Sequence, residues 1–167
     1  MRMSELPAPL TPPDCDLRDF PFMPLRVARL RDSEFAANVE PEAGFYAFFL
    51  WSAMWHQLPA ASAPDDEATL TRMVGLGRDL KTFRRLRDGI LYGCDKCSDG
   101  RLYHPVVAEQ ACEAWAQKLW QRQRTSAARA ARQQRLSSPH ETRPTDTVTD
   151  IVTEVVADSV TENVTAS

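Results

Sequence analysis

Residues 65–104 read DDEATLTRMVGLGRDLKTFRRLRDGILYGCDKCSDGRLYH, and this stretch decides the fold class. Its first part predicts a helix capped by Asp65 or Asp66 and ended by the GLG segment at 75–77, because Asp accepts hydrogen bonds from a first turn and Gly lets the chain leave a helix. A second helix is predicted over 79–89, with one apolar face. Two short helices joined by a Gly-containing turn are typical of a helix-turn-helix.

The second part of the stretch predicts a β-hairpin. Asp99-Gly100 lies between short extended runs at 90–95 and 101–104, and Asp-Gly in this position is a strong turn signal. The order of elements that follows is helix, helix, helix and hairpin, once a helix before residue 65 is included. That order is typical of a winged helix, in which the third helix enters the major groove of DNA.

The helix before this stretch is predicted over 42–57, directly after Pro41, which suits a first helical turn. Its many aromatic residues lie at three- and four-residue spacings, so we expect it to be the central, mostly buried helix. Gly44 within it is expected to mark a close helix crossing. Residues 58–64, LPAASAP, are expected to form a loop.

The predicted fold class is therefore mainly α with a small β-hairpin, and the chain divides into four segments. We expect a flexible, Pro-rich segment over 1–16 and a winged-helix-like domain over 17–121. A long helix opened by Pro105 then continues as a basic projecting helix over 122–138. Residues 139–167 repeat a Val-Thr-acid unit with no large apolar side chain, which predicts a disordered acidic tail.

The formal net charge of −3 conceals a basic body between acidic ends. Residues 17–138 carry 18 Lys and Arg against 14 Asp and Glu, net +4. Residues 1–16 carry one Arg and three acids, net −2, and residues 139–167 carry one Arg and six acids, net −5. A basic body of this kind favours a polyanionic partner.

Two groups of cations are the candidate DNA contacts. On a helical wheel, Arg78, Lys81 and Arg85 lie within about 60° of one another, opposite the apolar face. A second stripe lies on the last helix, where no acid occurs between Glu113 and Glu141. The alternatives are a solvated helix face for the first group and a solvated helix end or coiled-coil contact for the second. The candidate residues are Arg78, Lys81, Arg84, Arg85, Lys96, Arg101, Lys118, Arg122, Arg129 and Arg132.

Chemistry at a metal or catalytic site is only weakly indicated. Cys94 and Cys97 have the spacing of half a zinc site, but two reduced thiols in a turn are the favoured interpretation because only one such pair occurs. His56 and His104 are predicted to be packed or capping residues, since no nucleophile lies near them in the sequence. No phosphate-binding glycine loop occurs. We therefore expect neither catalysis nor a cofactor.

Location is predicted from the lack of long apolar runs. The longest, Phe45 to Trp55, covers 11 residues and contains Ser52, whereas a membrane-spanning helix needs about 20. The N-terminal residues have no apolar core of signal-peptide length. We expect a cytoplasmic protein without a membrane partner, with its four cysteines reduced.

Several motifs resemble the YdaU-like family of short prophage and phage proteins, over about residues 17–125. The motifs are GFY at 44–46, WHQ at 55–57, PAASAPDDE at 59–67, DGRLYHPVV at 99–107 and AW at 114–115. The resemblance implies a winged-helix-like domain of the kind found at the N-terminus of replication initiators. It also implies DNA binding, with recruitment of a replicative helicase or its loader, and supplies no catalytic residues.

Three hypotheses for function remain open at this point. The first is a prophage-type DNA-binding protein that acts in replication initiation on double-stranded DNA. The second is a non-catalytic adaptor that recruits a helicase or loader, and the third is a transcriptional regulator, which would need a dimer. In the first, the acidic tail at 139–167 is expected to compete with DNA for the basic stripe.

Overall fold

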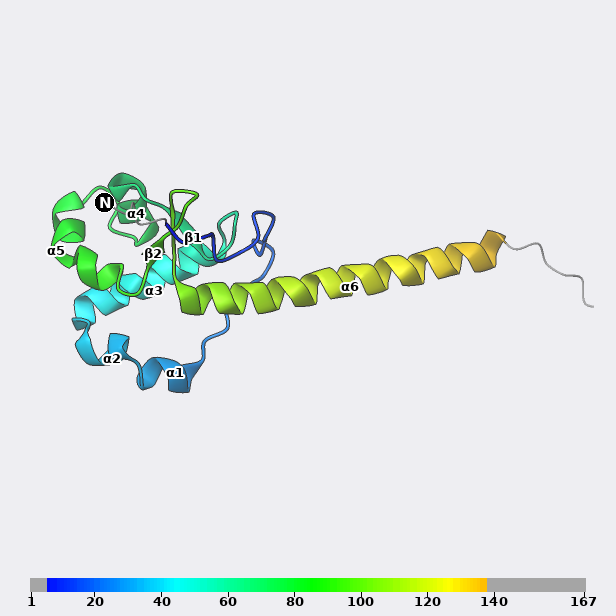
Figure 1. Cartoon of the computed structure of the whole chain (residues 1–167), viewed down its shortest axis with the longest axis horizontal. Helices are drawn as coiled ribbons and strands as arrows, with labels where there is room; N and C mark the ends of the chain where they lie inside the picture. Colours follow the sequence, from blue (N-terminus) through cyan, green and yellow to red (C-terminus); the bar gives the residue numbers. More distant parts are fainter. Residues whose placement is uncertain (1–5, 138–167) are drawn as a thin grey trace, which may run out of the picture.

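Residues 6–137 are described by a computed structural model and are mainly helical, with a small antiparallel sheet. Most elements gather at one end of the molecule, and the last helix projects from them as a long rod (Figure 1). This confirms the predicted class at its coarser level, mainly α with a small β element. The elements are α1 (Val27–Arg31), α2 (Glu34–Asn38), α3 (Pro41–Trp55), β1 (Ser62–Pro64), α4 (Glu67–Met73), α5 (Leu80–Ile90), β2 (Asp95–Lys96), β3 (Arg101–Tyr103) and α6 (Pro105–Ser137).

Helix α3 lies at the centre of the core. Pro41 occupies its first turn, as predicted, and Leu50 and Met54 are fully buried. Phe45 and Phe49, however, are 58% and 47% exposed. The predicted burial therefore applies to only part of the helix circumference, because aromatic content alone does not say which face meets the core.

Helices α3 and α5 cross closely at Gly89, and the expectation that Gly44 marks the crossing is wrong. A Cβ on Gly89 would lie 2.6 Å from the Cβ of Ala43, so a larger residue does not fit there. A Cβ on Gly44 would lie 3.6 Å from Cζ of Phe35, which is an ordinary contact. The crossing fixes α5 to the central helix, with Phe83 of α5 fully buried.

Helices α4 and α5 are joined by a short turn and capped in the predicted way. Asp66 accepts a hydrogen bond from the backbone N–H three residues on at 2.8 Å, and Asp79 does the same for α5 at 3.0 Å. Gly75 and Gly77 in the turn have φ values of +85° and +64°. These are left-handed conformations that glycine adopts without strain, so the turn depends on both residues.

The sheet has three strands, with β3 between β1 and β2. The hairpin of β2 and β3 was predicted, but β1 lies in a segment predicted to be a loop. Ser62 of β1 pairs with Tyr103, and Pro64 pairs with Arg101, in antiparallel register. The chain between α3 and α4 is thereby tied to the hairpin that follows α5.

Residues 6–16 pack onto the body, which corrects the predicted flexible segment over 1–16. The Thr11 hydroxyl donates to the carbonyl of Ala60 at 2.8 Å. Cys15 is fully buried, and its own carbonyl accepts from the N–H of Ala60 at 2.8 Å. Prolines prevent regular structure but do not stop an irregular segment from packing.

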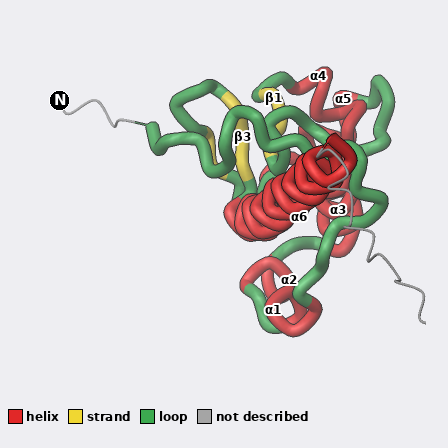
Figure 2. Tube along the Cα trace, turned by 90° about the vertical axis from the view of Figure 1, so that its right-hand side faces the viewer, coloured by secondary structure: helices red, strands yellow, loops and turns green. Residues whose placement is uncertain are grey.

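Helix α6 is continuous across the predicted boundary between residues 121 and 122. Its first turns bury Val107, Ala111 and Trp115, whereas residues 119–137 are all exposed; we call this exposed part the arm. Figure 2 looks along α6. In this view the sheet, α4 and α5 lie on one side of α6, and α1 and α2 lie on the other. The predicted tail at 139–167 lies outside the described residues. Within residues 6–137, no helix has the length and apolar character needed to cross a membrane.

Candidate nucleic-acid interface

The outward face of α5 carries the first predicted group of cations. Phe83, Leu86 and Ile90 are buried against the body, so the opposite side of the helix faces solvent. The helical-wheel assignment is thus confirmed in its geometry. The exposed residues on and just before this helix are Arg78, Lys81, Arg84 and Arg85, together with Asp79 and Asp88.

Two of these cations are held by carboxylates from other elements. The Arg85 guanidinium donates to both carboxylate oxygens of Glu42 on α3, at 2.8 and 2.9 Å. Arg84 forms an ion pair with Glu67 of α4 at 2.8 Å. The hydrogen bond that Arg85 donates to Glu42 raises the pKa of Arg85 further above its usual range. All four side chains are well exposed, so solvent screens each pair and it adds little to the stability of the fold.

The hairpin cations contribute less to an outward surface than predicted. Lys96 pairs with Asp65 at 2.8 Å. Arg101 is half-buried and donates from Nε to the Ser62 hydroxyl at 2.8 Å, which ties β3 to β1. Arg101 therefore holds the sheet together, and its assignment as a contact to the flanking backbone is not supported by this geometry.

Lys118 is a structural residue, which corrects its place in the predicted stripe. Its side chain is only 9% exposed. The ammonium donates to the carbonyl of Asp16 at 2.7 Å and forms an ion pair with the Asp19 carboxylate. It also lies 5.6 Å from the ring centre of Trp115. The lysine thus anchors the N-terminal segment to α6 and is withdrawn from solvent.

The arm presents the remaining cations of the stripe to solvent. Arg122, Arg129 and Arg132 are exposed, and no Asp or Glu occurs in residues 114–137. The Arg122 guanidinium lies 5.7 Å from the Trp115 ring centre, a cation–π contact that leaves its outer N–H groups open. At 1.5 Å per residue, Arg122 and Arg132 are about 15 Å apart along the helix axis.

The structure does not bring the two groups of cations together. Figure 1 places α5 at one end of the long axis of the molecule and the tip of the arm at the other. The face of α5 and the stripe of the arm are therefore two separate basic surfaces. The sequence predicted two groups of cations on two helices, but local periodicity does not give the distance between them.

The cysteine pair of the hairpin lies in a poor environment for thiolate ligands. Burial raises the pKa of the Cys94 thiol to about 12, and burial likewise raises that of Cys97. In the described part of the chain, no group of three or more His, Cys, Asp or Glu side chains is placed to hold a metal ion.

The sequence analysis missed the acidic partners of the α5 cations. Glu42 is 43 residues from Arg85 in sequence, and Glu67 is 17 residues from Arg84. Local periodicity carries no information on such pairs, because they depend on how α3, α4 and α5 pack. No match was found when the chain was compared with protein-family models, curated proteins and solved structures. The resemblance to the YdaU-like family therefore stays a prediction.

Proposed function

We propose that this protein binds duplex DNA as a winged-helix-like module, with the exposed face of α5 in the groove and the arm on the phosphate backbone. The observation that carries the proposal is the setting of α5. This helix follows a short turn after α4, buries its apolar side in the body and exposes its cationic side. A recognition helix needs the same division, because one side must be rigidly held while the other remains open.

The sheet supports this function by fixing the hairpin beside the helix pair. Strand β1 lies before α4 in the chain, and β2 and β3 follow α5, yet all three belong to one sheet. Helices α4 and α5 therefore lie, in chain order, between strands that pair with one another in the sheet. A hairpin anchored in this way is a candidate wing that contacts the DNA backbone, with Lys96 as its exposed cation.

The ion pairs on α5 are compatible with DNA binding. An exposed pair is worth little, so a DNA phosphate can replace Glu42 at Arg85 or Glu67 at Arg84 at small cost. Before binding, the carboxylates hold the guanidinium groups in fixed positions. The arm differs, since arginines without nearby acids attract phosphates without reading sequence.

The biological setting proposed for this binding is replication initiation in a phage or prophage. Its support is the sequence resemblance to the YdaU-like family, carried mainly by DGRLYHPVV at 99–107. Part of this motif is structural, since Leu102 and Tyr103 are buried within the sheet. A replicative helicase or its loader is the partner that the resemblance proposes.

A non-catalytic adaptor is the second candidate, favoured by the aromatic surface of α3. Phe45 and Phe49 are both exposed, and their ring centres are 5.0 Å apart. Paired exposed aromatic rings are frequent where another protein binds. An adaptor would form a complex with a purified helicase loader that Phe45→Ser/Phe49→Ser disrupts, and would not bind duplex DNA even at about 50 mM salt.

The discriminating experiment is fluorescence anisotropy with a labelled duplex, performed over a series of salt concentrations. Lys81→Ala/Arg85→Ala should weaken binding about tenfold and make the salt slope shallower by about 1, because Lys81 counts as one phosphate contact of about 0.9 and Arg85 only exchanges Glu42 for a phosphate. Arg18→Ala/Arg31→Ala is the control, since it removes the same charge from exposed sites outside α5. Equal effects of the two double variants would refute the role of α5.

A further inference from the structure

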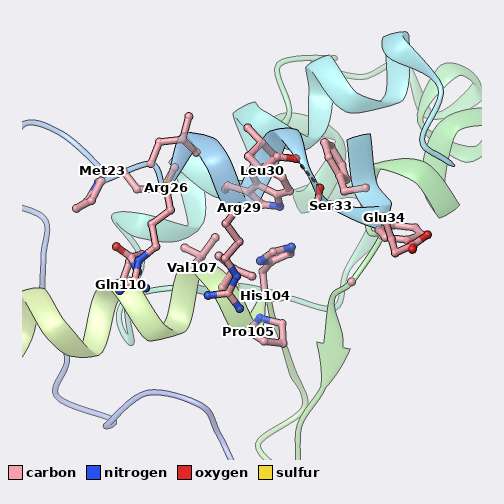
Figure 3. A pocket seen from close by; sticks show the side chains of 17 residues that line it. Met23, Arg26, Arg29, Leu30, Ser33, Glu34, His104, Pro105, Val107 and Gln110 are labelled. Carbon is pink, nitrogen blue, oxygen red and sulfur yellow. Dashed lines mark hydrogen bonds between the residues drawn. The ribbon is translucent and has the colours of Figure 1, made fainter. Parts of the chain in front are cut away.

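A cavity of about 250 Å³ lies between the α1–α2 segment and the body, away from both basic surfaces. Met23 and Leu30 line it from the N-terminal segment, and Trp51 of α3 and Val107 of α6 line it from the body. His104 lies directly before α6, and Figure 3 shows its imidazole pointing toward Leu30. The lining atoms are mostly apolar, which is typical of small-molecule sites.

Two polar atoms in this lining are buried without a hydrogen-bond partner among the described residues: Nε1 of Trp51 and Nδ1 of His104. Trp51 is 4% exposed and His104 is 9% exposed. Their ring centres are 4.8 Å apart, so the two rings are in contact. Native proteins rarely bury polar atoms without partners, and such atoms often mark sites of function.

We propose that this cavity binds an uncharged aromatic molecule of one or two rings that carries a hydroxyl group. An apolar cavity of about 150 Å³ accommodates benzene, so the larger volume here admits a second ring. A hydroxyl is the small group that both donates and accepts. Neither nitrogen is exposed to the cavity as it stands, so both rings must turn slightly before a hydroxyl can accept from the indole N–H of Trp51 and donate to the imidazole nitrogen of His104.

The charges around the cavity favour an uncharged ligand. Arg26 at its edge already pairs with Glu113 at 2.7 Å, and Arg29 pairs with Glu109. Burial lowers the pKa of His104 to about 4, so its imidazole is neutral near pH 7. An anionic group would therefore gain little from these residues, while it would lose its hydration on entering the cavity.

The α1–α2 segment gives the ligand a way in. Neither α1 nor α2 contains a buried residue. Leu30 and Phe35 are only partly buried against the core, and segments without fully buried residues are the parts of a fold that open most readily. A bound ligand would contact both sides of the cavity and hold the segment against the body.

Isothermal titration calorimetry of the full chain with 2-naphthol and 2-methylnaphthalene tests the proposal. The two probes have similar shapes, and only the first carries a hydroxyl. We expect saturable 1:1 binding of 2-naphthol and about tenfold weaker binding of 2-methylnaphthalene, because the latter leaves both polar atoms without partners. Absent binding of 2-naphthol, or equal affinity for the two probes, would overturn the proposal.

Three variants locate the binding site, with circular dichroism as the check on folding. Val107→Phe fills the cavity and should reduce 2-naphthol affinity at least tenfold. His104→Phe keeps the ring contact with Trp51, so both probes should then bind within about threefold of each other. This second variant decides the matter if the first does not fold. Phe49→Ala removes an exposed ring elsewhere and should leave binding unchanged; loss of binding there, or unchanged discrimination in His104→Phe, contradicts the site.

Discussion

Helix α5 and the arm of α6 carry the same kinds of side chain in opposite electrostatic settings. On α5, Arg84 and Arg85 are each held by a carboxylate from another helix, Glu67 and Glu42. In the arm, residues 114–137 contain no acid at all. The difference shows that a cation on an exposed face is not equally available everywhere, because its intramolecular partners compete with phosphate.

The two settings suit two different tasks. Carboxylates from α3 and α4 fix the guanidinium positions on α5 and reduce the free energy gained on binding phosphate, which favours selection of a particular DNA geometry over overall affinity. The arm has the reverse balance, so it should supply most of the salt-dependent affinity. The predictions below test this division, beginning with the largest effect.

Neutralising the stripe of the arm should have the largest effect. Arg129→Gln/Arg132→Gln removes two exposed contacts, and at about 0.9 slope units per contact the affinity at about 0.1 M salt should fall about 60-fold. Glutamine preserves the helix, since its propensity is close to that of arginine. The matched control is Arg124→Gln/Arg135→Gln, whose positions lie on average about 100° around the same helix from Arg129 and Arg132. Equal losses in the two double variants, measured by anisotropy, would show that total charge matters and the stripe does not.

A larger side chain at the crossing of α3 and α5 should lower the free energy of unfolding. Gly89→Ala places a Cβ within 2.6 Å of Ala43, so the free energy of unfolding in urea should fall by about 1–3 kcal/mol. Gly44→Ala is the control, because its Cβ meets only an ordinary contact and should stabilise α3 by up to about 1 kcal/mol. A Gly89→Ala variant as stable as Gly44→Ala would contradict the close crossing.

The junction between the body and α6 should make stability depend on pH. Burial lowers the pKa of His104 from its ordinary value of 6.5 to about 4. The charge of Asp95 opposes this shift, and the charge of Arg29 adds to it. Between these pH values the unfolded chain binds a proton that the folded chain does not. Stability should therefore decline as pH falls from about 6.5 toward 4, by up to about 1.4 kcal/mol per pH unit. Urea unfolding of His104→Phe should lack this decline between about pH 7 and 5.

Releasing a cation on α5 should have the smallest effect. Glu42→Gln frees Arg85 and removes a negative charge beside the proposed groove contact, so DNA affinity should rise about threefold. Asp32→Asn makes the same charge change beside Arg31, far from α5 in sequence. Affinity should stay the same in that control. An unchanged affinity in Glu42→Gln would show that Arg85 does not reach the DNA.

Local patterns were enough to predict α3, α4, α5, α6 and the hairpin, because caps, turns and apolar faces are encoded within a few residues. Asp66 is an example, since it caps the helix directly after it. The short helices α1 and α2 were not predicted. Strand β1 was missed because Ser-Ala-Pro at 62–64 has no strand pattern of its own. It becomes a strand only by pairing with β3, about 40 residues later in the chain.

The same limit applies to the candidate site. The exposed cationic face of α5 follows from helical periodicity, which a wheel reproduces. Periodicity does not predict that Lys118 binds the Asp16 carbonyl and the Asp19 carboxylate, because about 100 residues separate these partners in the sequence. The unpartnered nitrogen of His104 was equally invisible, because it depends on which side chains happen to surround the ring.

The most direct test of the central claim is the affinity of the full chain for a duplex of about 20 base pairs, measured at several salt concentrations. If cations of α5 and the arm contact phosphates, binding is measurable at about 50 mM salt and the plot of log K against log salt has a slope of about −2 or steeper. Absent binding at that salt concentration, or a slope shallower than about −1, would contradict DNA binding by these surfaces.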